Sequence, residues 1–435
     1  MKSKRNRLGF ILLTFLLGCG AVFAGILFSK NPDRGTAWIA EPAEFILSSQ
    51  VQDKRLYLQT LALFRRDRPG YGIDTAAQET AYDHPMAYAL YASAEARRFL
   101  VTRDRGAFEN ANRAATWLIN HKDLAETGDI GWGLPFAWDA FSDGTMNPPN
   151  TVYTITTALG IMALLDTYEA CRVAYAKEDS ACTDFLGTAI QAAQTFLKGR
   201  FDQIPDTNEI VFWYSQFPHD SYHVLNVSAM FAGQLQRLAQ YVLSFGERAI
   251  FEEFANRAIR YIVNRMVVDE KGNPYWYYLG DKKPHNVVNR PNDLIHEAYT
   301  IFGIAEYVAH GGRLAESVDL GLLLESLKLF LGEAGVIYEF PKCWDPGPGK
   351  EEIRYRPARL WGVGFALFVA SYIEQLVDRN HRISSALFES LLKYWTNGQW
   401  NFMPNSESPF YPRQVAHVLL GLSGWFFPTS WIPGG

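Results

Sequence analysis

Side chains that can accept or donate a proton gather where long connections lead into apolar helical stretches. His, Tyr, Asp and Glu in such places are typical of general acid–base catalysis. Each could also cap a helix or complete a hydrogen-bond network, so their convergence matters more than any single member. The candidate catalytic residues are Tyr214, Tyr222, His223, Asp139, Asp293, His296 and Glu297.

A second set of side chains in the same connections is suited to holding a substrate. Aromatic rings offer flat apolar faces for sugars, and arginine pairs with carboxylates. Together these residue types favour a polysaccharide substrate, particularly one that contains uronic acids. The candidate substrate-binding residues are Trp138, Asn150, Tyr153, Asn226, Arg356, Arg359, Trp361 and Arg413.

The reaction class that this pattern favours is proton abstraction beside a uronate carboxylate, as in an epimerase or a lyase. Arg356 or Arg359 would neutralise the carboxylate, which makes the C5 proton of the sugar more acidic. His223, Tyr222 or Tyr214 would serve as base and acid. The two tryptophans of the binding set would stack on the sugar rings.

Two other functions fit the same residues. A glycoside hydrolase would use a carboxylate pair, here Asp139 with either Asp293 or Glu297. A non-catalytic scaffold would bind the chain during assembly of an envelope polysaccharide. Such a scaffold should tolerate replacement of His223 or Asp139 if it still folds.

Cofactor motifs are absent from the sequence. There is no P-loop and no strand-borne GxGxxG, so we expect no nucleotide cofactor. His219 and His223 have i,i+4 spacing, but Pro218 and Asp220 disfavour a helix there, and no HExxH occurs. We therefore expect no catalytic metal, whereas a structural calcium ion held by loop carboxylates remains open.

Composition and charge restrict the class of partner. A content of 48% hydrophobic and 20% charged residues is typical of a globular protein with a large core. Four of the 41 basic residues and none of the 46 acidic residues lie in residues 1–28, so the remaining chain carries a formal net charge of −9. This balance disfavours a nucleic-acid partner.

Two kinds of predicted helix alternate along the chain, and little resembles a sheet. One kind is almost free of charge and should be buried on all sides, whereas the other has a charged face. The buried kind begins near residues 84, 152, 222, 293, 359 and 413, which gives a helix pair roughly every 70 residues. We expect an all-α fold, an (α/α)6-type toroid of inner and outer helices; an open solenoid would use shorter pairs.

In such a toroid all six outer-to-inner connections emerge at one end. These are the long connections, such as residues 131–151, whereas the opposite turns are short and plain. The candidate residues should therefore share one mouth.

Residues 1–28 form a separate segment, which we expect to be a membrane anchor. Four basic residues precede 21 uncharged residues from Leu8 to Phe28, enough to cross a bilayer with the basic flank in the cytoplasm. A signal peptide or a lipoprotein segment lipidated at Cys19 are the alternatives. Residues 29–70 should form a linker and capping segment, and residues 71–435 the toroid. The expected protein is single-pass, with its C-terminal domain extracytoplasmic, either periplasmic or at the cell surface.

The cysteines allow one disulfide bond. Cys171 and Cys182 flank a predicted helix end and bend, so in an oxidising compartment they could close a small loop. Two unpaired thiols are the alternative. Cys343 has no evident partner.

The run "FWYSQFPHDSYHVLN" resembles a stretch in the C-terminal helical domain of D-glucuronyl C5-epimerases. The shared pattern is an aromatic pair, a proline shortly after it and "VLN" at the start of the next helix. The match departs where Val227 follows the asparagine, since the family usually continues with glycine there. The resemblance implies a helical toroid that acts on uronic-acid polymers, with Tyr214 and Asn226 at the substrate cleft.

Overall fold

The computed structural model describes residues 54–428 except 176–179, 286 and 378–381, and these belong to one compact unit, Ser48–Gly435. The expected membrane anchor, residues 1–28 with Cys19, lies outside the described residues, as does most of the expected linker. Within the described part, no helix is long and apolar enough to span a membrane.

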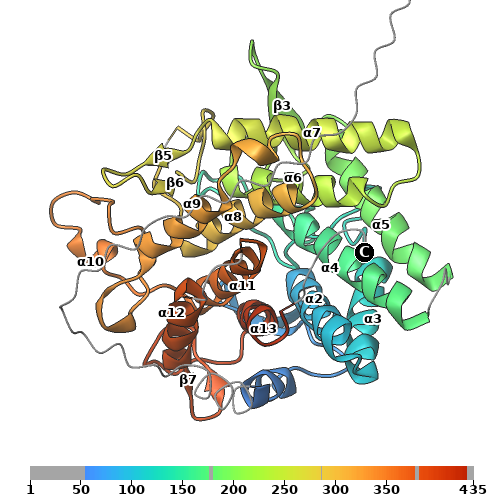
Figure 1. The fold of residues 1–435 in the computed structure, drawn as a ribbon, viewed down its shortest axis with the longest axis horizontal. Helices are drawn as coiled ribbons and strands as arrows, with labels where there is room; N and C mark the ends of the chain where they lie inside the picture. Colours follow the sequence, from blue (N-terminus) through green and yellow to red (C-terminus); the bar gives the residue numbers. More distant parts are fainter. Residues whose placement is uncertain (1–53, 176–179, 286, 378–381, 429–435) are drawn as a thin grey trace, which may run out of the picture. The chain divides into compact units, whose positions relative to one another are not determined.

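Six helices form a closed inner ring (Figure 1). Each contacts the next along the chain, and the last contacts the first, which closes the ring. Most of their residues are buried, as expected for helices without a polar stripe. The inner helices are α2 (Pro85–Thr102), α4 (Thr154–Tyr175), α6 (Leu225–Ala239), α8 (Leu294–Ala309), α11 (Leu360–Leu376) and α13 (Pro412–Phe426).

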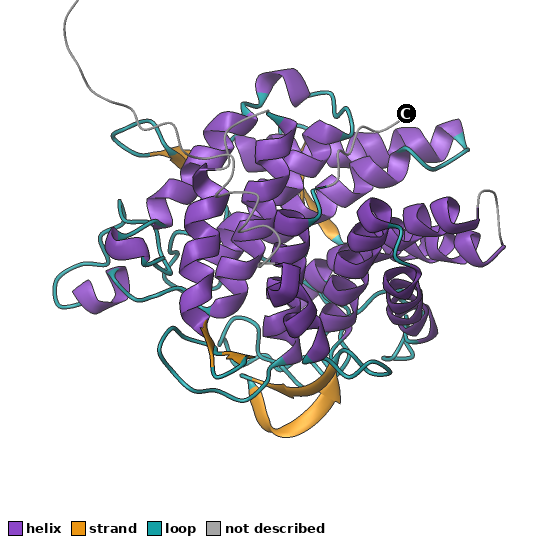
Figure 2. Ribbon diagram, turned by 60° about the horizontal axis from the view of Figure 1, so that its bottom comes forward, coloured by secondary structure: helices purple, strands orange, loops and turns teal. Residues whose placement is uncertain are grey.

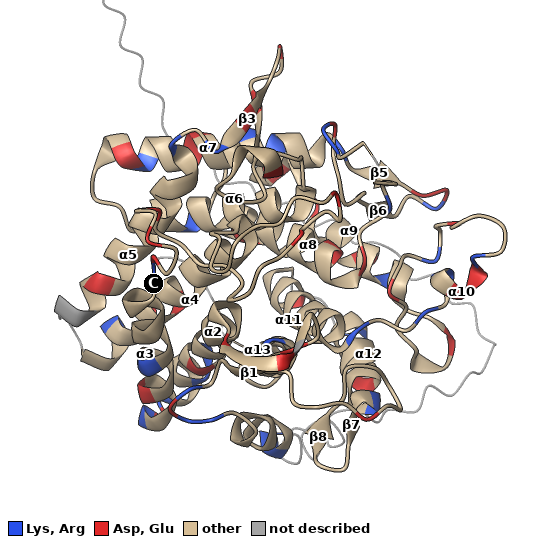
Figure 3. Cartoon of the chain, turned by 180° about the vertical axis from the view of Figure 1, so that it is seen from behind, with Lys and Arg blue, Asp and Glu red and all other residues tan. Residues whose placement is uncertain are grey.

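Amphipathic helices cover the outside of this ring and carry many of the charged side chains (Figure 3). The outer helices are α3 (Arg105–Asn120), α5 (Ser180–Leu197), α7 (Phe245–Val263), α9 (Leu320–Ser326) and α12 (Arg382–Leu391). Residues 54–62 are also helical and complete the outer layer next to α13, where the Tyr57 and Phe427 rings pack edge to face at 5.1 Å. The predicted (α/α)6 toroid is confirmed.

The fifth outer helix departs from the predicted pattern. The apolar stretch after residue 317 breaks into α9 and a 3-10 turn, η3 (Leu327–Phe330), with another 3-10 turn, η2 (Ala315–Ser317), before it. Asp319 begins α9 because its side chain accepts the backbone N–H groups of Gly321 and Leu322.

Glycines allow the inner helices to cross closely. A Cβ atom added to Gly303 of α8 would lie 2.2 Å from the Ala229 carbonyl of α6, and one added to Gly364 of α11 would lie 2.8 Å from the Val418 backbone of α13. Such distances leave no room for a side chain, so the spacing of these helix pairs requires glycine.

The long connections all lead into inner helices and carry four two-stranded antiparallel hairpins (Figure 2). The sequence predicted little sheet, and these hairpins are correspondingly short. They precede α2, α6, α8 and α13 and so shape one end of the ring. The strands are β1 (Tyr71–Asp74) with β2 (Ala77–Asp83), β3 (Phe201–Ile204) with β4 (Glu209–Phe212), β5 (Val267–Val268) with β6 (Pro274–Tyr275), and β7 (Trp395–Thr396) with β8 (Gln399–Trp400).

The remaining short elements also lie in the connections between helices. They are the 3-10 turns η1 (Pro218–Asp220), η4 (Glu333–Gly335) and η5 (Leu392–Tyr394), and the one-turn helix α10 (Glu351–Arg354).

A buried ion cluster joins four inner helices near the end of the ring that carries the short turns. Arg237 of α6 binds Asp166 of α4 at 2.7 Å and Glu169 at 2.8 Å, and lies 3.6 Å from Glu306 of α8. Arg97 of α2 binds Asp166 from the other side at 3.2 Å. The Arg237 side chain is 1% exposed, so its charge depends on these partners.

The protonation of this cluster follows from its burial. Burial would raise the pKa of Asp166, but Arg97 and Arg237 outweigh burial and lower it. For Glu169 burial prevails, and together with the nearby Asp166 charge it raises the pKa to about 7. The cluster therefore holds a carboxyl that is partly protonated near neutral pH.

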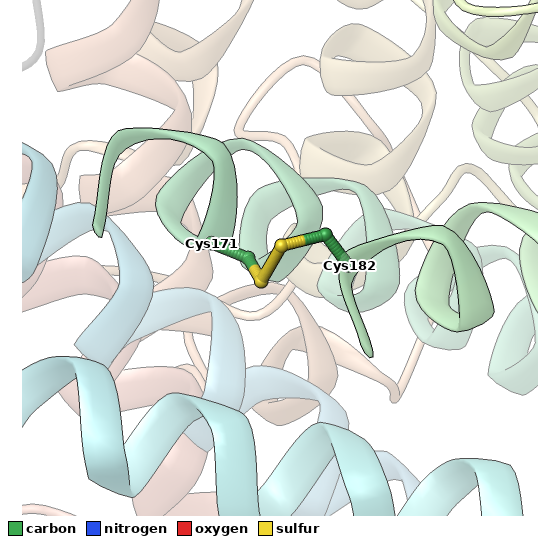
Figure 4. The surroundings of a disulfide bond; sticks show 2 residues. All are labelled: Cys171 and Cys182. Atoms are coloured by element: carbon green, nitrogen blue, oxygen red, sulfur yellow. A yellow bond between two sulfur atoms is a disulfide. The ribbon is translucent and has the colours of Figure 1, made fainter. Parts of the chain in front are cut away.

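A disulfide bond joins Cys171 near the end of α4 to Cys182 at the start of α5 (Figure 4). The Cα atoms are 5.7 Å apart, and the bond closes a loop of sequence separation 11. Cys343 is a free, exposed cysteine.

Glu297, a predicted catalytic residue, lies in the core instead. Its side chain is fully buried and accepts hydrogen bonds from Asn292 Nδ2 at 3.0 Å and from the Trp276 backbone N–H at 3.4 Å. Burial raises the pKa of Glu297 to about 8. This residue shares the first turn of α8 with Asp293 and His296 but points away from them.

Replacing Arg237 with leucine should lower the free energy of unfolding by about 3–5 kcal/mol, because Asp166 and Glu306 would lose a buried partner. Chemical denaturation measures this change. Arg105→Gln is the matched control, since Arg105 is 87% exposed and its loss should change stability by less than about 0.5 kcal/mol. Equal effects of the two substitutions would contradict the assigned role of the cluster.

Replacing Cys171 and Cys182 with serine should lower the free energy of unfolding by about 3 kcal/mol, because the unfolded chain gains the entropy of an opened loop. Denaturation with and without a reductant measures the change. Cys343→Ser should leave stability unaltered. If reduction of the wild-type chain causes no loss, the loop closure contributes nothing.

The buried Glu297 carboxyl should make stability depend on pH. Its pKa is about 8 in the folded state, above the ordinary carboxyl value of about 4.5, so its contribution is complete below pH 4.5. That contribution is lost as the pH rises through 8. Glu297→Gln should therefore show a smaller fall in Tm between pH 5 and pH 8 than the wild type. An unchanged difference in Tm would show that Glu297 is ionised in the core.

Candidate active site

The candidate active site is a cavity of ≈ 290 Å³ inside the ring, at the end where the long connections meet. Side chains from all six inner helices and from the connections between them line it. The lining residues from the helices are Met86, Ile155, Thr156, Asn226, Val227, His296, Tyr299, Trp361, Arg413 and Gln414, and those from the connections include Phe136, Trp138, Tyr153, Tyr214, Tyr278 and Arg359.

The aromatic wall of the cavity comes largely from the connection before α4. Trp138 and Asn147 exchange backbone hydrogen bonds of 3.0 and 2.9 Å, which fold this connection back on itself. The Asn147 side chain then donates to the Tyr153 hydroxyl at 3.1 Å and to Asp220 at 2.6 Å. These bonds fix Trp138 and Tyr153 where the sequence predicted a substrate-binding wall.

His296 and Asp293 form a histidine–carboxylate pair at the start of α8. Asp293 caps the helix by accepting the His296 backbone N–H at 3.2 Å, and the same carboxylate oxygen lies 2.7 Å from His296 Nδ1. Burial would raise the pKa of Asp293, but His296 and then Arg359 outweigh burial and lower it. With Nδ1 held by Asp293, the other ring nitrogen, Nε2, is left for a ligand.

Arg359 connects this pair to a second carboxylate. Its guanidinium lies 3.0 Å from Asp293 Oδ2 and 2.5 Å from Glu339 Oε1. Arg356 also pairs with Glu339. The arginines that the sequence assigned to a substrate carboxylate thus already have carboxylate partners within the chain.

A tyrosine–histidine pair lies one turn deeper. The Tyr299 hydroxyl is 2.6 Å from His417 Nε2, and His417 Nδ1 is 2.7 Å from the Arg413 carbonyl oxygen. A carbonyl can only accept, so Nδ1 carries the proton and Tyr299 donates to Nε2. Burial lowers the pKa of His417 to about 3, which keeps this ring neutral.

Arg413 of α13 is held by Asp74 at the end of β1. The two groups form a bidentate pair with distances of 2.7 and 2.9 Å. Burial would raise the pKa of Asp74, but Arg413 outweighs it and lowers the pKa to about 2. The guanidinium lies 4.8 Å from the centre of the Trp361 ring, so the ion pair also orients an aromatic wall of the cavity.

Several polar groups of the cavity remain for a ligand. The side-chain oxygens of Asn226 and Gln414 are buried and have no hydrogen-bond partner among the described residues. The Tyr214 and Tyr278 hydroxyls interact with each other, and a phenol hydroxyl can both donate and accept. Burial raises the pKa of Tyr214 to about 12, so it stays protonated at neutral pH. Such groups suit a hydroxyl-rich ligand.

An open groove of ≈ 490 Å³ adjoins the cavity. The two spaces share Tyr278, His296 and Arg359 in their walls, so they meet at the histidine–carboxylate pair. Asp293 and Arg356, both predicted site residues, line the groove.

His223 and Tyr222 do not reach the cavity. His223 Nδ1 lies 2.8 Å from the Tyr261 hydroxyl of α7, and Nε2 lies 3.2 Å from Asp202 of β3. Tyr222 donates to Asp143 at 3.2 Å. Both precede the start of α6. His223 contacts the outer helix α7 and Tyr222 contacts the connection before α4, so neither lines the cavity.

Asp139 and Asn150 also do not line the cavity. Asp139 accepts backbone N–H groups of its own loop, including Gly144 at 2.9 Å, so it shapes the connection. Asn150 adopts a left-handed conformation with φ of 63° in the turn before α4. Of the three carboxylates expected for a hydrolase, Glu297 lies in the core, Asp139 binds its own loop and Asp293 lines the groove beside the cavity.

The predicted set missed Asp74, Tyr278, Glu339 and Gln414, each of which lines the site or holds a residue that lines it. Asp74 had no sequence signal, because it is 339 residues from Arg413. Among the described residues, no group of three His, Cys, Asp or Glu side chains is arranged to hold a metal ion.

Comparison with known proteins relates the chain through its fold. No protein-family model matches the sequence, and no curated protein matches it. The structure is similar to cellobiose 2-epimerase from Bacillus thermoamylovorans B4167, with a TM-score of 0.57 and 10% sequence identity over 88% of this chain and 99% of that chain. It is also similar to an inactive variant of the α-1,6-mannanase GH76A of Salegentibacter sp. HEL1_6, solved with α-1,6-mannotriose (TM-score 0.54, 11% identity, 87% and 99% coverage).

A third similar structure is the family 105 glycoside hydrolase from C. acetobutylicum ATCC 824, with a TM-score of 0.50 and 12% identity over 79% of this chain and 94% of that chain. At these identities the likeness shows the fold alone. The (α/α)6 toroid is therefore shared with sugar epimerases and glycoside hydrolases, whereas the resemblance to D-glucuronyl C5-epimerases stays a prediction.

Proposed function

We propose that this chain is a carbohydrate-active enzyme that binds a saccharide in the ring cavity and transfers a proton, as an epimerase or a lyase does. The observation that carries the proposal is the His296–Asp293 pair, with its 2.7 Å contact, in the wall of an aromatic cavity. The toroid neighbours support it, since their names describe sugar epimerases and glycoside hydrolases.

In this proposal His296 Nε2 is the base that removes a proton next to a carbonyl or carboxylate of the sugar. Asp293 stabilises the imidazolium that forms, as carboxylates do in other histidine pairs. Tyr214 is the acid, because it lines the cavity and burial raises its pKa to about 12, which keeps the hydroxyl protonated. The base lies on α8 and the acid in the connection before α6, which suits removal of a proton on one side and return on another.

Hydrolysis is the weaker alternative. Asp293 and Glu339 are the carboxylates that line the groove, and both bind Arg359. A general acid of a hydrolase needs a raised pKa, whereas the pKa of Asp293 is lowered. The scaffold function differs from both in needing no proton transfer at all.

Several finer features stay part of the proposal. They are a uronic-acid polysaccharide as substrate, an extracytoplasmic site of action, a membrane anchor in residues 1–28 and partners in envelope polysaccharide assembly. No cofactor is required by the proposed chemistry, and a structural calcium ion stays open.

The test is proton exchange by the full-length protein in D₂O with a panel of uronic-acid and neutral oligosaccharides, followed by mass spectrometry. Deuterium gained without cleavage would mark an epimerase, and unsaturated ends would mark a lyase. Shorter saturated products without deuterium at carbon would favour hydrolysis. Binding without any change in mass would favour the scaffold.

His296→Gln should lower the rate of exchange or elimination about 10²–10⁴-fold, because the reaction loses its general base. His223→Gln is the matched control, since His223 lies outside the cavity and should leave the rate within a factor of two or so once stability is equalised. A larger loss from His223→Gln than from His296→Gln would overturn this assignment of the base.

A further inference from the structure

The groove beside the cavity indicates how a longer saccharide lies in the site. We propose that the cavity takes the end unit of a saccharide chain and that the groove takes the next unit, which carries a negative charge. This inference rests on the proposed function for the identity of the ligand as a saccharide, and it adds the direction and charge of the chain.

The cavity is closed toward the far end of the ring. Phe365 packs against Tyr299 with ring centres 4.6 Å apart, and below it Phe302 and Phe368 have ring centres 5.1 Å apart. These three phenylalanines are at most 1% exposed. Beneath them lies the ion cluster around Arg237. A saccharide chain therefore cannot pass through the ring and must enter end first.

The cavity is also enclosed sideways, because its wall includes residues from all six inner helices. Its connection to the groove runs past Tyr278, His296 and Arg359, which line both spaces. A ligand that fills the cavity and continues into the groove passes these residues. The reacting position beside His296 then lies at the linkage between the first and second units.

The charges differ between the two spaces. In the cavity Arg413 is balanced by the bidentate Asp74. In the groove three arginines face two carboxylates, because Arg356 and Arg359 share Glu339 and Asp293 while Arg290 has no ion pair with a described residue. The groove therefore has one uncompensated positive charge, in a chain whose formal net charge is −5.

The backbone of Arg290 is held in place, and its side chain is exposed. Its carbonyl accepts the Tyr278 backbone N–H at 2.8 Å, and the adjacent Pro291 forms a bridge with Tyr277. Beside it Val288 is 76% exposed, and Phe340 forms a buried wall of the groove. A cation on a fixed backbone next to an apolar wall suits a sugar unit that bears a carboxylate or a sulfate.

The test uses oligosaccharides of one to four units from pectin, alginate and hyaluronan, each with and without methyl esterification of its carboxylates. Calorimetric titration of the full-length protein should show that the second unit tightens binding about three- to fivefold when the carboxylates are free and charged. The methyl ester lacks the charge, so its second unit should not tighten binding. The second unit of the charged oligosaccharide should also lose its effect in 0.5 M NaCl, since salt screens exposed charges.

Arg290→Gln should remove the gain from the second acidic unit and leave binding of the single unit unchanged. Lys283→Gln is the matched control, since Lys283 is an exposed cation of the same connection that does not line the groove. Binding that does not depend on length, equal binding of acid and ester, or no binding by any series would overturn the proposal. Length-dependent binding without proton exchange would instead overturn the proposed function and leave the groove assignment in place.

Discussion

The closed ring depends on the guanidinium of Arg237 and its carboxylate partners. The inner helices pack mainly through apolar side chains, which by themselves allow more than one rotation about each helix axis. Burying Arg237, Asp166 and Glu306 is costly unless α4, α6 and α8 present their charges to each other. We infer that the cluster favours the arrangement in which these helices have their native rotation. The rotation of these helices also determines which of their side chains line the cavity.

Paired charges also determine the chemistry at the open end. Arg413 is matched by Asp74, and Arg359 by Asp293 and Glu339, so the cavity wall contains several ions but little net charge. These ion pairs hold Trp361 and His296 in place, and because their charges cancel they attract anions only weakly. In the proposed reaction His296 and Tyr214 are the groups that exchange a proton. With its charges paired, the depth of the cavity is poorly suited to a highly charged ligand.

The sequence predicted the architecture well, because helices without charged residues are buried, and their regular spacing along the chain indicates an inner ring. It also located the mouth, and eight predicted residues, including Tyr214 and Trp361, line the cavity. It could not separate His223 from His296, since both stand near the start of an inner helix. Each residue turns a helix by about 100°, so an error of two residues in a helix start reverses the direction of a side chain. Asp74 meets its partner Arg413 only when the ring closes, so no local sequence pattern identifies it.

The seam of the ring joins the two ends of the described chain. Thr60 accepts a hydrogen bond from Trp400 at 2.8 Å, and Asp74 holds Arg413 across 339 residues of sequence. Contacts of such separation form late in folding, because a long loop must close before they contribute. During synthesis the growing chain therefore lacks its cavity until the last helix has emerged. A truncated product would carry most of the fold but have no working site.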